Sequence, residues 1–214
     1  MNKISTIINE AVNNYISVVS ENYNIDAKEL KKLWDNKRAN SGGKKSTYNG
    51  KKFEDKINNE NILLNLGYVK EDYYLLKNDT DKRYIFVIQN GFKKYMKNKY
   101  NINIIRLPDE AYIIEYKTGK VDIKILEKKS QNIQGSVETK LWASPSLKRE
   151  YELILGNKFN ISYALSVNSY LQKLLISSHI KYRTLMNILY ENNIEVLYGD
   201  DTDYFTKIDL WINK

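Results

Sequence analysis

The chain has 214 residues, enough for one large domain or for one domain with an appendage. Hydrophobic residues make up 42% and charged residues 28%, which favours a folded globular protein over a fibrous or disordered one. The absence of cysteine and the single histidine, His179, exclude disulfides, zinc–thiolate sites, thiol nucleophiles and multi-histidine metal sites. Any metal site is therefore built from oxygen ligands, which suit Mg²⁺, Mn²⁺ or Ca²⁺.

The chain is basic. It has 34 Lys and Arg residues against 26 Asp and Glu residues, a net charge of +8, which favours a polyanionic partner, nucleic acid first. The abundance of Asn, Ile, Lys and Tyr equally fits the drift of an AT-rich genome, so charge alone leaves both interpretations open. No apolar run reaches the roughly 18 residues of a membrane span, and polar residues interrupt the N-terminus. We therefore expect an intracellular, cytoplasmic protein with no membrane partner.

The N-terminal part predicts a helical hairpin over residues 1–37. Apolar residues recur at helical spacing over residues 4–15, and Asp26 is placed to cap a second short helix that ends at Trp34. Residues 38–52 are rich in Gly, Ser, Asn and Lys, which predicts a basic linker or loop. Its lysines could meet phosphates or remain solvated. The main domain is predicted to span residues 53–214.

The main domain begins with a predicted helix from Phe53 that ends near Gly67, a suitable C-cap. β-Branched and aromatic residues then predict strands, and a lysine-rich stretch predicts a short basic helix or loop. The strands are expected at residues 84–89, 102–107, 111–116 and 121–128, and the basic segment at residues 92–100. Thr118 and Gly119 mark a hairpin turn between the last two strands.

The C-terminal half predicts a crossover between two parallel strands. A helix starting at Ser136 is expected to break at Pro145 and to resume over residues 147–155, before a strand at residues 159–167. A helix at residues 182–192 and a strand at residues 195–198 follow. Together these elements predict an α/β fold with a mixed central sheet flanked by helices.

The turn at Gly119 decides which carboxylate faces Glu127 across the hairpin. A three-residue loop, which needs positive φ only at the glycine, places Asp109 opposite Glu127; a two-residue turn places Glu110 there. We favour the longer loop. Because alternate residues of a strand share a face, Glu127 and Lys129 point the same way. Two facing carboxylates beside an amine are suited to metal-assisted phosphodiester hydrolysis, but spacing alone equally fits an ion-paired hairpin end.

The sequence Pro108-Asp109, followed by Glu127-Lys128-Lys129, resembles the motif of the PD-(D/E)XK nuclease superfamily. The longer stretches at residues 127–131 and 135–141 resemble a group of type II restriction endonucleases, some of them encoded by large algal viruses. The resemblance covers roughly residues 46–167. It implies a restriction-endonuclease-like core in which Asp109 and Glu127 bind Mg²⁺ and Lys129 acts on the attacking water. It also implies that Glu54 is directed toward the metal.

Other polar residues are candidates for contact with DNA. Gln131, Asn132 and Gln134 could read base edges, because their amides pair bidentately with adenine. Ser136 could bind a phosphate at a helix start or act as a plain N-cap. The candidates for backbone phosphates are Arg38, Lys44, Lys45, Lys93, Lys94 and Lys97.

The resemblance implies a type II site-specific deoxyribonuclease that hydrolyses double-stranded DNA with Mg²⁺ and leaves 5′-phosphate ends. A palindromic site would be met by a homodimer. A repair or mismatch nuclease, or a junction resolvase, would keep the same site with another substrate. A non-catalytic DNA-binding protein is the alternative from a different class.

Overall fold

The computed structural model describes residues 51–132, 135 and 137–214, together with Asn13, Ser17, Asp26, Lys28, Glu29 and Lys31. The chain divides into two compact units, Met1–Tyr48 and Asn49–Lys214. The predicted hairpin and linker fall almost entirely outside the described residues. The predicted cap at Asp26 is confirmed, because its Oδ1 accepts a 2.7 Å hydrogen bond from the main-chain N–H of Lys28.

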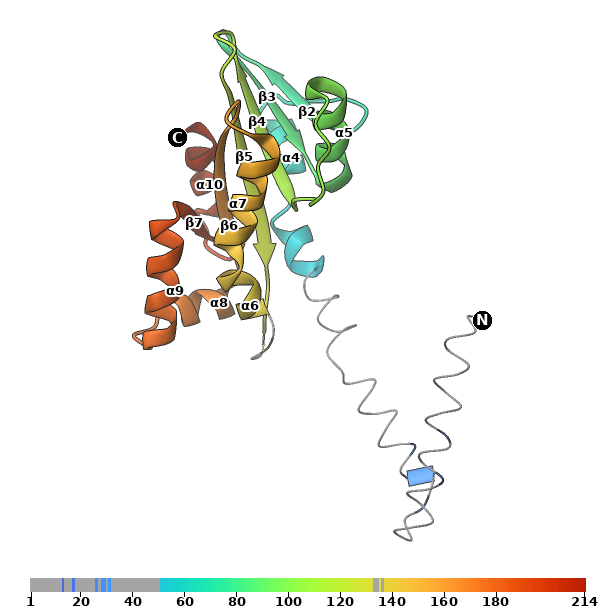
Figure 1. Cartoon of the computed structure of the whole chain (residues 1–214), viewed down its shortest axis with the longest axis vertical. Coiled ribbons are helices and arrows are strands. Elements are labelled where there is room, and N and C mark those ends of the chain that lie inside the picture. The colour runs from blue at the N-terminus through green and yellow to red at the C-terminus, as the bar shows by residue number, and fades with distance from the viewer. Residues whose placement is uncertain are drawn as a thin grey trace. The chain divides into compact units, whose positions relative to one another are not determined.

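The described part of the second unit contains one seven-stranded sheet in the order β1 to β7 (Figure 1). Pairing is antiparallel from β1 to β5 and parallel from β5 through β6 to β7. The predicted mixed sheet and parallel crossover pair are thus confirmed. The strands are β1 Val69–Lys70, β2 Leu75–Asn78, β3 Lys82–Val87, β4 Glu110–Tyr116, β5 Val121–Lys129, β6 Asn160–Val167 and β7 Ile194–Tyr198.

Helices cover both faces of the sheet, as predicted (Figure 1). Alternation along β5 sends Ile123 and Ile125 into one hydrophobic core and Leu126 into the other. The first core is closed by α5 to α9, and the second by the helical residues 51–56, α4 and α10. The bounds are α4 Glu60–Asn65, α5 Gln89–Tyr100, α6 Val137–Trp142, α7 Ser144–Leu155, α8 Ser169–Leu175, α9 Ile180–Glu191 and α10 Tyr204–Asn213.

The strand predicted at residues 102–107 is wrong. This segment is irregular, and β3 pairs directly with β4, which leaves no place for a strand between them. Ile104 is buried at 3% exposure, whereas its neighbour Ile105 is 80% exposed. Ile104, together with the partly buried Ile102, therefore anchors an irregular connection whose composition predicted a strand.

The helix predicted from Phe53 to Gly67 is two helical segments, residues 51–56 and α4. The break lies at two asparagines whose side chains bind elsewhere. Asn58 Oδ1 accepts from the main-chain N–H of Glu60, and Asn59 Nδ2 donates to Glu110 on the sheet. Gly67 follows α4 with φ +88°, so the predicted stop is confirmed.

Among the helices that the structure describes, none is both long and apolar enough to cross a membrane.

Candidate active site

The β4–β5 hairpin has the register of the three-residue loop. The main-chain N–H of Tyr116 bonds to the carbonyl of Lys120 at 2.9 Å, and Gly119 has φ +86°. Glu110 pairs with Leu126, so the preceding Asp109 lies opposite Glu127. The predicted register is confirmed, and Glu110 takes the other face of the sheet.

Asp109, Glu127 and Lys129 converge where β4 begins and β5 ends. Lys129 Nζ lies 2.6 Å from Glu127 Oε2 and 3.4 Å from Asp109 Oδ2. The side chains of Glu127, Lys129 and Asp109 are 10%, 14% and 23% exposed, so the cluster is largely screened from water. Within the described part of the chain, Asp109 Oδ1 and Glu127 Oε1 accept no hydrogen bond.

Burial sets the protonation of this cluster. It raises the pKa of Glu127, an effect that Asp109 reinforces and Lys129 opposes. Burial also acts against the charge of Lys129, but the carboxylates of Glu127 and Asp109 outweigh it and raise the pKa of this amine. Lys129 is therefore a charged ammonium that balances two carboxylates.

Glu54 lies on the helical residues 51–56, beside this cluster. Its pKa is raised first by burial and then by the charge of Asp109. Its carbonyl accepts a 3.5 Å hydrogen bond from Lys128 Nζ. In residues 51–132, 135 and 137–214, no three Asp, Glu, His or Cys side chains gather closely enough to hold a metal ion. Glu54 is thus a neighbour of the Asp109–Glu127 pair and not a third member of it.

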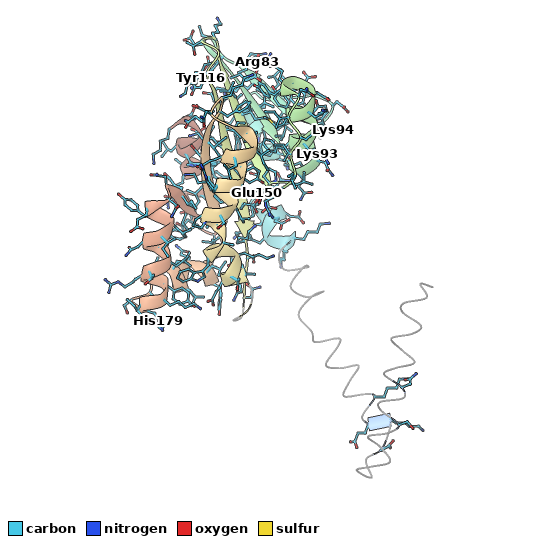
Figure 2. The ribbon with its side chains drawn as sticks, in the orientation of Figure 1. Arg83, Lys93, Lys94, Tyr116, Glu150 and His179 are labelled. Atoms are coloured by element: carbon cyan, nitrogen blue, oxygen red, sulfur yellow. The ribbon has the colours of Figure 1, made fainter. Side chains whose placement is uncertain are left out.

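A second ion pair, which the sequence did not indicate, flanks the site. Glu150 Oε2 on α7 lies 3.0 Å from Arg106 Nε and 2.9 Å from a terminal nitrogen of the same guanidinium. Figure 2 labels Glu150. The hydroxyl of Tyr151 donates to the carbonyl of Arg106 at 3.4 Å. The position of Arg106 three residues before Asp109 was the available signal; its partner lies 44 residues away in sequence.

The opposite face of the same strands carries a buried network. Lys128 Nζ forms an ion pair with Glu110 Oε1, and their side chains are 5% and 2% exposed. Asn59 Nδ2 and the Tyr112 hydroxyl donate to Glu110 Oε2 at 2.6 and 3.0 Å. This network ties β4 and β5 to the turn before α4.

The predicted backbone-binding lysines within the described residues lie on α5. Lys93, Lys94 and Lys97 are all exposed, and Figure 2 labels the first two. The main-chain N–H of Gln89 donates to the carbonyl of Pro108 at 3.1 Å, so α5 begins beside the site. Lys94 also lies over the ring of Tyr73, 5.2 Å from its centroid.

Gln131 is not placed to read bases, contrary to expectation. It is 7% exposed, and its main chain is held on both sides by the Asn168 amide. Asn132 is exposed and accepts from Asn168 Nδ2 at 3.1 Å. The remaining candidates lie outside the described residues: Arg38, Lys44, Lys45, Gln134 and Ser136.

No protein-family model matches the chain, and no curated protein matches it. Among solved structures, the chain is similar to an XisH family protein from Nostoc punctiforme, with 13% sequence identity and a TM-score of 0.33. The match covers 68% of this chain and 88% of that chain.

Proposed function

We propose that this protein is a magnesium-dependent deoxyribonuclease that cleaves double-stranded DNA at a short specific sequence, as type II restriction endonucleases do. The observation that carries the proposal is the convergence of Asp109, Glu127 and Lys129 at adjacent strand ends, with one amine inside 3.4 Å of both carboxylates. Two carboxylates beside one cation are the groups that metal-assisted hydrolysis of a phosphodiester requires, which supports the proposal.

The ligand set fits a hard divalent cation. Asp109 Oδ1 and Glu127 Oε1 are without hydrogen-bond partners in the described residues, so each carboxylate keeps one oxygen for a ligand. Magnesium, when bound, supplies neutralisation of phosphate charge and activation of a water molecule. The chain supplies the carboxylates of Asp109 and Glu127, and solvent would complete the set.

The protein's own residues then have distinct tasks. The main-chain N–H of Lys128 fixes the Asp109 carboxylate by a 2.6 Å hydrogen bond. The two carboxylates outweigh burial and raise the pKa of Lys129, so its side chain stays a charged ammonium. This ammonium is suited to orienting the attacking water and to stabilising negative charge on the phosphate. Burial around Glu127 limits the access of bulk water.

The charge of the chain supports DNA as the substrate. The net charge is +8, and α5, which begins next to Pro108, presents four exposed lysines. Contacts of this kind would position a duplex without reading its sequence. A homodimer would then present two such sites to the two strands of a palindrome.

Incubation of the protein with a long unmethylated duplex, with Mg²⁺, with Ca²⁺ and with a chelator, followed by sequencing of the ends, tests the proposal. We expect discrete fragments that share one short sequence, formed only with Mg²⁺. Asp109→Asn should abolish cleavage and keep DNA binding, while Asp72→Asn, a change at an exposed position, should cleave normally.

Other outcomes would redirect the proposal. Cleavage confined to mismatched or branched DNA would retain the site and assign it to a repair nuclease or a resolvase. A shift of intact DNA under all three conditions would remove the catalytic role and leave a DNA-binding protein in which Lys129 only neutralises two carboxylates.

A further inference from the structure

Lys124 is a buried lysine that belongs neither to the buried network around Glu110 nor to the candidate active site. It lies in the middle of β5, on the face opposite Glu127 and Lys129, and is 5% exposed. Among the described residues it forms no hydrogen bond and no ion pair, unlike Lys128 on the same face, which binds Glu110. Its Nζ lies 5.8 Å from the centre of the Trp211 ring on α10.

The amine lines a cavity of about 520 Å³. The cavity forms because β7 begins at Ile194, opposite Tyr163, while β6 begins three residues earlier at Asn160. The first residues of β6 therefore pair with β5 on one side and have no strand on the β7 side. The volume is in the range of about 300–1,000 Å³ that is usual for small-molecule sites.

The charges around this cavity do not balance. Three lysines and two carboxylates line it. Lys120 lies 3.1 Å from Asp122, and Lys214 lies 2.6 Å from Glu195, so each carboxylate has its own exposed lysine. The charge of Lys124 is left without a counter-ion. Burial accordingly lowers its pKa, although Asp122 and Glu195 act in the opposite direction.

The remaining walls are aromatic and apolar, apart from the polar side chains of Asn160, Ser162 and Asn193. Trp211 lies below the Lys124 amine, and Tyr116 and Tyr190 line the same cavity. Figure 2 labels Tyr116 at the hairpin end of the sheet, far from the end at which β5 reaches Lys129. Lys124 and Lys129 are five positions apart along β5, about 17 Å at roughly 3.3 Å per residue. The cavity is therefore distinct from the candidate active site.

We propose that this cavity binds a small organic anion with a single negative charge and a flat ring, its anionic group against Lys124 and its ring along Trp211. A carboxylate and a phosphodiester share this chemistry. The anion supplies the one counter-charge that the cavity lacks, and the ring fills aromatic walls that water solvates poorly. The proposal does not depend on nuclease activity.

Fluorescence of Trp211 reports occupancy of the cavity. The chain has three tryptophans, so Trp34→Phe and Trp142→Phe together leave Trp211 as the single tryptophan, whose emission is excited selectively over that of the tyrosines. Three probes separate the contributions: benzoate has both ring and charge, benzamide has the ring alone, and acetate has the charge alone. We expect a saturable change of emission with benzoate, and binding weaker by about tenfold or more with the other two.

Variants of Lys124 test the anion contact. In the same background, Lys124→Met should weaken benzoate binding by about tenfold or more, and Lys124→Arg should retain it. Lys173→Met, at an exposed position of α8, should leave it unchanged. Circular dichroism checks that each variant is folded. If Lys124→Met does not fold, the comparison of benzoate with benzamide still tests the proposal, because it uses protein in which Lys124 is unchanged. Equal affinity for benzoate and benzamide, or no saturable response, would overturn the proposal. DNA cleavage plays no part in these measurements.

Discussion

The main-chain N–H of Lys128 holds Asp109 Oδ2 at 2.6 Å, while the side chain of the same residue leaves by the other face of the sheet and pairs with Glu110. Lys128 thus connects the candidate site to the buried network beneath it. A slip of one residue in the pairing of β4 with β5 would turn the side chains of β5 to the opposite faces of the sheet. Lys128 would then take the place of Lys129 or Glu127 in the candidate site. The ion pair therefore stabilises the register on which the site depends.

Lys128→Met should be strongly destabilising, because it leaves Glu110 buried without its cation. We expect a loss of about 3–5 kcal/mol in the free energy of unfolding, measured by urea denaturation. The double variant Lys128→Met/Glu110→Gln should recover part of this loss, since no uncompensated charge then remains. Equal losses in the single and double variants would contradict a specific interaction between the two residues.

Lys129→Met should increase the effect of divalent cations on stability. Without the ammonium, Asp109 and Glu127 lack their shared cation, and a bound metal ion can take over its role. Ca²⁺, which tests binding without cleavage, should raise the Tm of this variant more than that of the wild type. Lys158→Met, at an exposed position away from the carboxylates, is the matched control. An identical Ca²⁺ response in both variants would argue against a cation site between the carboxylates.

Glu127 should give stability a specific pH dependence. Burial raises its pKa in the folded protein above the usual 4.5, so the protonated form is favoured by folding. The stability that Glu127 contributes is fully present below pH 4.5 and is lost as pH rises through the raised pKa of the folded protein. Glu127→Gln lacks this loss, so the stability of the variant relative to wild type should increase with pH over that window in urea titrations. A constant difference would show that Lys129 fully offsets the burial of Glu127.

The raised pKa of Glu127 also predicts how the cleavage rate declines at low pH. If ionised Glu127 binds the metal, the cleavage rate should decline, as pH falls, at a higher pH than an ordinary glutamate would give. Mg²⁺ competes with the proton, so a higher Mg²⁺ concentration should move this decline to lower pH. A decline that does not respond to Mg²⁺ would place the titration elsewhere.

Local sequence rules were sufficient for the geometry around Asp109, Glu127 and Lys129. The positive φ at Gly119 determines the loop length, the loop determines the register, and strand alternation puts Glu127 and Lys129 on one face. Each step involves residues close in sequence or paired along one hairpin. The register was therefore predictable, whereas the catalytic roles of the three residues stay predictions.

Features that depend on distant partners were not predictable in this way. Ile104 and Ile105 have the composition of a strand, but the direct pairing of β3 with β4 excludes one. Arg106 meets Glu150 only because α7 packs beside the segment before β4. Gln131 is polar and follows β5, yet Asn168, 37 residues away, holds its main chain in the interior.

Asn168 is the residue that fixes the chain after Lys129, and its replacement should release this segment. Its Oδ1 accepts from the main-chain N–H groups of Gln131 at 3.2 Å and Leu171 at 3.5 Å, and its Nδ2 donates to the carbonyl of Gln131 at 3.0 Å. Asn168→Ala removes the N-cap of α8 and leaves buried main-chain groups unpaired, at a cost of about 1–3 kcal/mol.

Hydrogen exchange measured residue by residue distinguishes this local role from general destabilisation. In Asn168→Ala, the amide of Gln131 should exchange faster by a larger factor than amides in β3, which Asn168 does not contact. Asn168→Asp keeps the accepting oxygen and loses the donor, so it should retain the cap of α8 and show an intermediate rate at Gln131. If all amides accelerate equally, Asn168 stabilises the whole fold and does not specifically hold the end of β5 beside the candidate site.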